Sequence, residues 1–159
     1  MDKPTDQVEF EAMLLGRYTI NPQYPQETGL LERSAYLLLS RLSMEGPMSI
    51  GQLCDAFGLN SSTINRQTTA LLRAGLVERI PDPDGGMARK FRITTKGRRR
   101  FDTERATKVT GLDDIMQDWA PEDVAAFAGY LRRFNRDIEH RRGQPWPRPE
   151  PVRPDLASS

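Results

Sequence analysis

The stretch 49–94 constrains the fold more than any other part of this 159-residue chain. It begins with a capping box, in which the Ser49 hydroxyl and the Gln52 side chain can each satisfy a backbone amide at a helix start. Apolar residues follow at helical spacing until Gly58, which supplies the left-handed conformation that commonly ends a helix. Asn60 then provides the cap of a second helix. The sequence therefore predicts two short helices joined by a tight turn.

The second of these helices, which we expect to end near Ala74, has two chemically different faces. Its core-facing positions are Ile64, Thr68, Leu71 and Leu72. The opposite face carries hydrogen-bonding and basic side chains and no carboxylate, which suits a helix that enters the DNA major groove. The residues expected to contact DNA from this helix are Ser61, Ser62, Thr63, Asn65, Arg66, Gln67, Thr69 and Arg73.

Two short strands and the loop between them complete a winged helix-turn-helix pattern. Residues 76–80 alternate apolar and charged side chains, and residues 89–94 do the same. The loop 81–88 contains two prolines and two adjacent glycines, which is typical of a hairpin tip. Arg89 and Lys90, at the start of the second strand, are further candidates for DNA contact. The alternative is a winged helix that binds protein instead of DNA.

The distribution of charge favours nucleic acid, although the net charge is only +1. Residues 60–110 contain 12 basic and 5 acidic residues, whereas residues 1–59 contain 4 and 8, and residues 111–159 contain 7 and 9. Phosphate binding requires a local positive field and not a high overall pI. The positive charge gathers on the expected recognition helix, the hairpin and the basic run 96–100.

Amphipathic patterns predict helices before this region. The first begins at Thr5 and continues to about Tyr18, and residues 21–25 break it with two prolines. A second helix, from about Gly29 to Met44, is apolar on most sides, as expected of a helix at the centre of a core.

Two more helices are expected after the hairpin. Thr94 or Thr95 caps a long helix that runs to about Asp118, and Pro121 suits the start of the last helix. The last helix has apolar residues at steps of three and four, which form an a/d seam that needs a partner helix. These seam residues are Val124, Phe127, Leu131, Phe134 and Ile138. The partner is either another helix of the same chain or a second copy, and a homodimer is the simpler answer because this small chain has few helices to cover the seam.

Composition also limits the class of protein. No stretch approaches 18 consecutive apolar residues, so we expect no membrane span, and the acidic N-terminus resembles no signal peptide. The single cysteine, Cys54, cannot form an internal disulfide and suits a reducing cytosol, so we expect a cytoplasmic protein. One histidine and one cysteine provide neither a metal site nor a nucleophile–base pair, so we expect no enzyme activity, no metal and no cofactor.

The order of two helices, helix-turn-helix, hairpin and two helices resembles the MarR family of bacterial transcriptional regulators over about residues 6–142. The most specific part is the pair of segments 76–79 and 93–97, which are similar to the family pattern "GLV-R, wing, LT-x-x-G". The resemblance implies a mainly α fold with a small β-hairpin wing. It places dimerisation helices at 1–28 and 95–142 and the winged helix-turn-helix domain at 29–94.

After these domains, residues 143–159 contain five prolines, which favour an extended, mostly disordered tail.

The resemblance also implies a function. Family members are obligate homodimers whose recognition helices enter successive major grooves, so we expect a pseudo-palindromic operator in double-stranded DNA. Many release DNA when a small aromatic or anionic ligand binds, so this chain is expected to be such a repressor. The positions that correspond to the ligand pocket are Arg17, Tyr18, Tyr36 and Phe101. Some members instead sense oxidants through a cysteine, which leaves redox sensing through Cys54 as an alternative.

The hairpin departs from the family pattern at one point. Family wings usually carry an arginine two residues after the wing aspartate, but here Asp84 is followed by two glycines. Either Arg89 or Lys90 replaces that arginine, or the wing contributes little to DNA binding. Arg79 matches the family pattern, and we expect it to brace the wing through Asp84.

Overall fold

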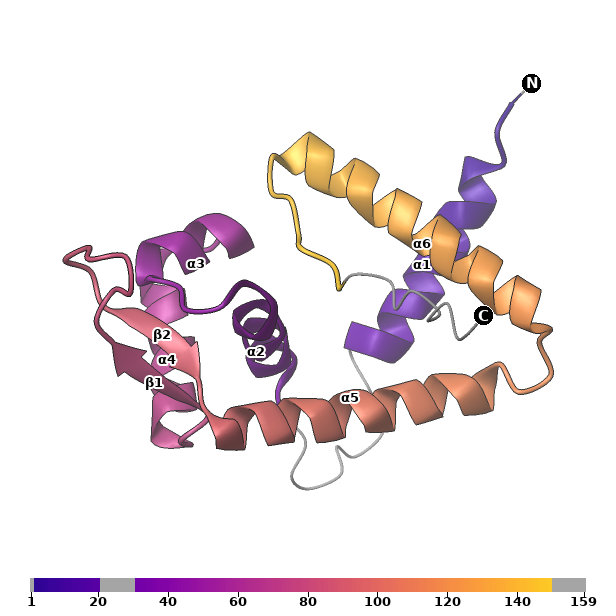
Figure 1. Ribbon diagram of the computed structural model, residues 1–159. Coiled ribbons are helices and arrows are strands. Elements are labelled where there is room, and N and C mark those ends of the chain that lie inside the picture. The colour runs from indigo at the N-terminus through magenta and orange to yellow at the C-terminus, as the bar shows by residue number, and fades with distance from the viewer. Residues whose placement is uncertain (1, 21–30, 150–159) are drawn as a thin grey trace, which may run out of the picture. The chain divides into compact units, whose positions relative to one another are not determined.

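The computed structural model describes residues 2–20 and 31–149 and contains two units (Figure 1). The first unit contains α1 (Thr5–Ile20), which begins where the sequence predicts. The predicted break at 21–25 lies outside the described residues. Five large apolar side chains of α1 are half exposed or more, and they are Val8, Phe10, Met13, Leu15 and Tyr18.

The second unit has the predicted order of elements. They are α2 (Arg33–Glu45), α3 (Ile50–Phe57), α4 (Ser61–Arg73), β1 (Val77–Ile80), β2 (Lys90–Ile93), α5 (Thr95–Ile115) and α6 (Pro121–Arg142). The two strands pair antiparallel, with Val77 opposite Ile93. The predicted fold class, mainly helical with a two-stranded hairpin, is therefore confirmed for the part of the chain that the structure describes.

The boundaries of α3 and α4 follow from local capping. Ser49 accepts a hydrogen bond from the backbone amide of Gln52, and the Gln52 side chain accepts one from the Ser49 amide. Gly58 ends α3 with a φ of 64°, and Asn60 caps α4 by accepting a hydrogen bond from the amide of Thr63. Both predicted caps and the predicted left-handed glycine are confirmed.

Other boundaries differ from the prediction. The second helix starts at Arg33 and not near Gly29, because Glu32 is extended (ψ 151°) and makes no side-chain cap. The helix after the hairpin ends at Ile115 and not near Asp118, and a turn follows in which the Trp119 amide bonds to the Met116 carbonyl.

The two strands are also shorter than predicted, 77–80 and 90–93. Thr94 is the N-cap of α5, where its hydroxyl accepts a hydrogen bond from the amide of Gly97.

The core of the second unit is built around α2. Its Leu38, Leu39 and Leu42 are at most 1% exposed, as expected of the predicted central helix. Figure 1 shows α2 between the helix-turn-helix and the first half of α5, and it also contacts β2 and α4. The hairpin is joined to this core at Met48 and Phe91, whose backbones exchange two hydrogen bonds of 2.8 and 3.1 Å.

α6 contrasts with α2, because no residue of α6 is buried. Its predicted seam is left without a covering helix in this unit, and Phe127, Leu131 and Phe134 are 39, 38 and 54% exposed. Val124 and Ile138 are half-buried. Among the described residues, no helix is both long and apolar enough to cross a membrane.

The first residues of the predicted Pro-rich tail, 143–149, form no helix or strand but make side-chain contacts. In residues 143–149, the Trp146 ring packs edge-on against Phe57 of α3, and Arg148 pairs with Glu139 of α6. Proline content excluded a helix here but did not exclude side-chain contacts with the core. The rest of the predicted tail, 150–159, lies outside the described residues.

Candidate nucleic-acid interface

The recognition face lies on α4. Ile64, Thr68 and Leu71 are buried, and the Thr68 hydroxyl donates to the Ile64 carbonyl at 2.8 Å, so this buried polar group is satisfied. The other side of the helix faces solvent. Of the residues predicted there, Ser61, Ser62, Asn65, Arg66 and Arg73 are exposed, and Thr63, Gln67 and Thr69 are half-buried.

The first turn of α4 is ordered by its cap. The Asn60 side-chain oxygen accepts hydrogen bonds from the Thr63 amide at 2.9 Å and from the Ser62 hydroxyl at 2.8 Å. The Ser62 hydroxyl therefore keeps only its acceptor capacity for a ligand. Asn65 and Arg66, one turn later, present donors from a fixed helix.

The wing is organised by Asp82. Its carboxylate accepts a hydrogen bond from the Asp84 amide at 2.9 Å and lies 3.4 Å from the Lys90 ammonium, and its carbonyl accepts one from the Gly85 amide. The Asp84 amide, the Lys90 charge and a further backbone bond from Gly86 lower the pKa of Asp82 against the opposing effect of desolvation. Asp82 therefore joins the start of the loop to its tip and to the start of β2, and we call this set of contacts the Asp82 clamp.

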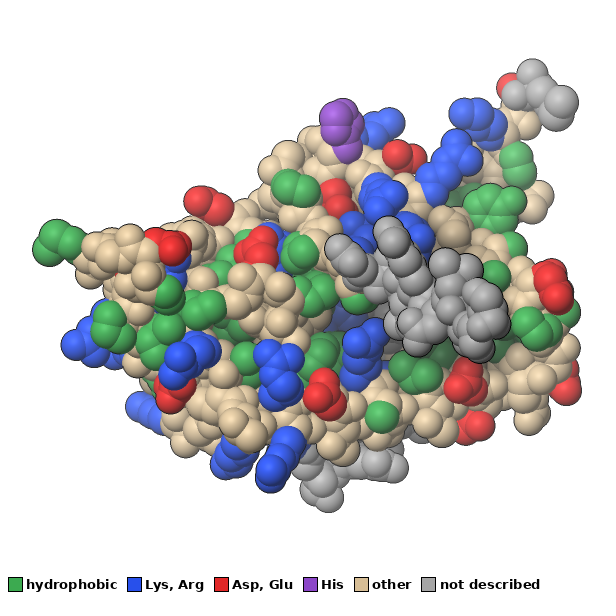
Figure 2. All heavy atoms as spheres, viewed as in Figure 1, with side chains coloured by type: hydrophobic (Ala, Val, Ile, Leu, Met, Phe, Trp, Pro, Cys, Tyr) green, Lys and Arg blue, Asp and Glu red, His purple; other side chains and the backbone are tan. Residues whose placement is uncertain are grey.

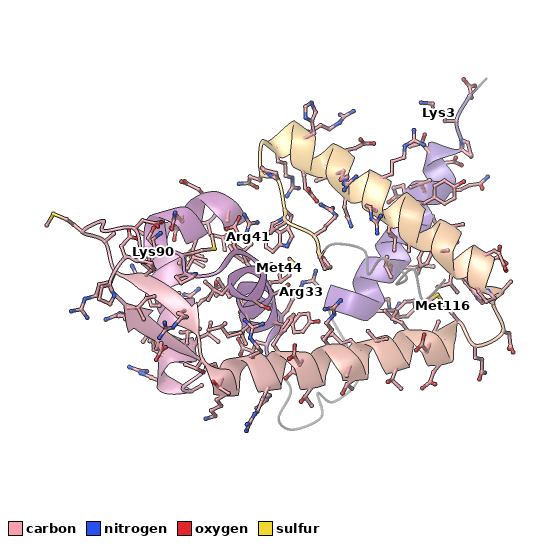
Figure 3. All side chains as sticks on the ribbon, viewed as in Figure 1. Lys3, Arg33, Arg41, Met44, Lys90 and Met116 are labelled. Atoms are coloured by element: carbon pink, nitrogen blue, oxygen red, sulfur yellow. The ribbon has the colours of Figure 1, made fainter. Side chains whose placement is uncertain are left out.

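This clamp corrects the expected brace between Arg79 and Asp84. The Arg79 guanidinium lies 5.6 Å from the centre of the Phe91 ring, and the residue that binds a cation in the wing is Asp82. Lys90, a predicted DNA contact, has a side chain only 12% exposed and is engaged with Asp82 (Figure 3). Arg89, in contrast, is exposed.

A groove of about 480 Å³ lies between the start of α3, α4 and the hairpin. Its lining residues are Ser49, Ile50, Gly51, Asn65, Arg79, Ala88, Arg89 and Phe91. The groove brings together two predicted contacts, Asn65 and Arg89, from elements 24 residues apart in the sequence. The start of α3 was missed as part of this surface, although the capping box had identified a helix N-terminus there.

The basic side chains of this region differ in their partners, and Lys96 and Arg98 bond to the Ala74 carbonyl and the Ser43 hydroxyl. Lys90, Arg92 and Arg100 pair with carboxylates. Arg66, Arg73 and Arg89 are exposed and have no side-chain partner within residues 2–20 and 31–149. Figure 2 shows Lys and Arg side chains over the hairpin, α4 and the first half of α5, and acidic side chains toward the far end of α5. The surface around α4 therefore offers donors and positive charge suited to phosphates and base edges.

The predicted ligand residues are only partly brought together. The rings of Tyr36 and Phe101 pack with their centres 5.0 Å apart, and the Lys108 ammonium lies 4.9 Å above Tyr36. Burial raises the pKa of Tyr36, and Arg105 opposes this rise. Arg17 and Tyr18 are on α1, which belongs to the other unit, and both are exposed.

Chemically reactive groups are sparse. Cys54 is a free, half-buried thiol on α3, and His140 is exposed near the end of α6. Within the described ranges, no group of three or more His, Cys, Asp or Glu side chains could hold a metal ion.

The comparisons with known proteins agree with this geometry. The model of the MarR family matches residues 31–85. The chain is 31% identical over 134 residues to the uncharacterized HTH-type transcriptional regulator YxaD of Bacillus subtilis (strain 168), and the match covers 84% of this chain and 94% of that protein.

Solved structures show the same fold. A MarR family protein from Bacillus stearothermophilus superposes with a TM-score of 0.65 at 22% identity, over 87% of this chain and 99% of that one. The PcaV transcriptional regulator from Streptomyces coelicolor, in complex with its natural ligand, gives a TM-score of 0.60 at 22% identity, over 87% and 98%.

We predict that Asp82→Asn loosens the wing. The substitution removes the negative charge that holds Lys90, so amide exchange in residues 84–89 should become faster while the core amides of α2 stay unchanged. Asp84→Asn is the matched control, because that side chain is exposed. Because the pKa of Asp82 is lowered in the folded protein, its stabilising effect is complete above the ordinary value of 3.8 and disappears as the pH falls through the lowered value. Equal exchange rates in both variants would contradict the clamp.

Proposed function

Because the chain belongs to the MarR family of transcriptional regulators, we propose that it is a homodimeric, sequence-specific DNA-binding repressor released by a small aromatic or anionic ligand. Members of this family are regulators and not enzymes. In this proposal, α1, α5 and α6 form the dimer interface, and the region 29–94 binds DNA. We place this function in the bacterial cytoplasm, at the nucleoid.

The observation that carries the proposal is the outer face of α4. Arg66 and Arg73 are exposed and have no side-chain partner among the described residues, Asn65 lines the groove, and α4 contains no carboxylate to repel phosphate. Arginine and asparagine are the side chains that make bidentate hydrogen bonds to guanine and adenine in the major groove. Arg89, on the opposite wall of the groove, is placed to contact the phosphate backbone.

The proposed dimer rests on unpartnered apolar surface. Phe127, Leu131 and Phe134 are exposed on α6 of the isolated chain, and Val109, Leu112 and Ile115 are exposed on α5. Fully burying one such side chain contributes about 1.5–3 kcal/mol. A second copy would supply the helices that this seam needs, and its symmetry would present two recognition helices to a pseudo-palindromic site about one helical turn apart.

We predict that Arg66→Ala costs about 1–3 kcal/mol of operator binding and relaxes specificity at one base pair, as expected of a guanine contact. Binding should be measured by fluorescence anisotropy against the selected operator and its single-base variants. Arg66→Lys keeps the charge but not the planar fork, so it should also lose specificity. Met87→Ala, at the exposed wing tip, should bind like the unmodified chain.

Two outcomes would change this assignment. An equal loss on every DNA sequence would make Arg66 a phosphate contact. No binding of the unmodified chain to any fragment of its own upstream region at low salt would favour a winged helix that binds protein.

We predict that Phe134→Glu weakens the dimer, because it places a charge on the seam where apolar surface must be buried. Sedimentation equilibrium should show a shift toward monomer at micromolar concentration. Asn135→Glu adds the same charge at the next position of α6, away from the seam, and should leave the dimer intact. A stable monomer formed by the unmodified chain would refute the dimer.

Ligand release is supported by the aromatic pair on α2 and α5. Tyr36 and Phe101 pack together beside Lys108, and Arg105 lies close enough to affect the Tyr36 phenol, so apolar rings and positive charge occur side by side. These features suit an aromatic acid. The structural neighbour PcaV was solved in complex with its natural ligand.

We predict that aromatic acids such as salicylate weaken operator binding by about five- to 150-fold, the range that corresponds to ordinary coupling free energies. Lys108→Gln should reduce this response, and Lys96→Gln, on the same helix but bonded to the Ala74 carbonyl, is the control. If thiol oxidants release DNA while aromatic acids do not, and Cys54→Ser abolishes that release, the redox alternative is correct.

A further inference from the structure

A buried arginine marks the place where the segment after α6 meets the helix-turn-helix. Arg41 of α2 is only 6% exposed, and one of its terminal nitrogens donates to the Glu45 carboxylate at 2.9 Å. Its other terminal nitrogen donates to the Pro145 carbonyl at 3.4 Å, and its guanidinium lies 4.7 Å from the centre of the Trp146 ring. Figure 3 labels Arg41 beside this segment. The positive charge of Arg41 is therefore enclosed in part by Pro145, a residue 104 positions away in the chain.

The same segment contacts α3 and the turn that follows it. The Trp146 ring meets the Phe57 ring edge-on at 5.1 Å. Gln144 lies against Gly58, the left-handed residue between α3 and α4, so closely that a Cβ atom at Gly58 would collide with the Gln144 side-chain amide. The segment thus covers the turn of the helix-turn-helix motif.

Glu139, in the last turn of α6, anchors the other side of the segment. Its carboxylate accepts hydrogen bonds from the Trp146 amide at 3.1 Å and from the Arg148 guanidinium at 3.0 Å. The bond from Arg148 is the main reason that the pKa of Glu139 is lowered and that of Arg148 raised. The chain turns at Gly143 with a φ of 63° and comes back on itself, so α6 and the segment are held together.

We propose that residues 144–149 are a strap that fixes the C-terminal end of α6 to α2 and α3, and that Trp146 is a positioning residue that sets the separation of the two recognition helices. The inference rests on the proposed function, in which α6 forms the dimer. No residue of α6 is buried, so α6 itself does little to hold this end against the DNA-binding region 29–94, which we call the head. The strap contacts α2 and α3 directly, and α3 packs against α4, so it links the dimer to the recognition helix.

The strap has a consequence that ordinary destabilisation would not have. Two heads held at a fixed separation bind both half-sites only when the DNA spacing matches. If the heads can pivot, the protein loses less affinity on an operator with mismatched spacing. It also gains less affinity on the operator with matched spacing. Loss of the strap should therefore reduce discrimination between operator spacings and leave the preference for the half-site sequence unchanged.

The test uses the full chain and a set of operators whose half-sites are moved apart or together by one and two base pairs. The unmodified chain should prefer the matched spacing by about five- to 150-fold, the range of typical coupling energies. Trp146→Ala should bring this ratio close to one, and Trp146→Phe should restore most of it because a ring again covers Arg41 and Phe57. Pro149→Ala, an exposed position at the end of the strap, is the matched control.

A second variant separates the strap from simple loss of a large side chain. Glu139→Gln removes the charge on which the Trp146 amide and Arg148 converge, at the surface of α6, and should also reduce the spacing preference. Single-base changes within the half-site should affect all variants equally. If Trp146→Ala and Glu139→Gln keep the full spacing preference, the inference is wrong while the proposed function stands. If the unmodified chain binds no operator, the proposed function fails and the inference fails with it.

The docking of the strap is tested without DNA by fluorescence. In a Trp119→Phe background, Trp146 is the remaining tryptophan. Its emission should be blue-shifted and should move to longer wavelength in Phe57→Ala. Emission of a fully exposed indole, unchanged by Phe57→Ala, would overturn the strap whatever the DNA experiments show.

Discussion

The burial of α2 is the constraint on which the rest of the second unit depends. Leu38, Leu39 and Leu42 are almost completely removed from water, and the helix contacts α4, β2 and α5. Each of these elements is short or amphipathic and could not bury its own apolar face alone. The same helix carries Arg41 to the strap and Tyr36 to the ring pair with Phe101. Hence the proposed DNA-binding surface, the proposed ligand site and the strap are all supported by α2.

Sequence patterns predicted the features that depend on neighbouring residues. The caps at Ser49, Asn60 and Thr94 each bond to a backbone amide three positions away, so a few consecutive residues are enough to identify them. The start of α2 was placed too early because apolar periodicity does not show where a helix lacks a side-chain cap, as at Glu32. Boundaries without a local signal are set by packing, which a single sequence does not display.

The following features, which the sequence did not predict, join residues that lie eight or more positions apart in the chain. The Asp82–Lys90 pair replaces the expected brace from Arg79, because the two ends of the loop meet only after the hairpin has formed. The strap was predicted to be disordered because its prolines exclude a helix, yet an extended segment can still be held by a ring and a salt bridge. Composition shows which backbone structure is excluded, and it does not show which side chains find partners.

The distribution of paired and unpaired cations explains how a chain with net charge +1 can carry a basic interface. Carboxylates neutralise Lys90 and Arg92 on the hairpin, so the wing strands carry little net charge. The wing tip also lacks the arginine that is usual in the family. Among the described residues, Arg66 and Arg73 on α4, Arg89 at the groove and Arg98 and Arg99 at the start of α5 pair with no carboxylate, so the positive field covers the helix and its surroundings. In the proposed dimer, DNA affinity would depend on the two recognition helices with little contribution from the wings. Such affinity is more sensitive to the distance between the recognition helices than affinity to which the wings also contribute. A strap that fixes the head to α6 is the kind of restraint that such an interface needs.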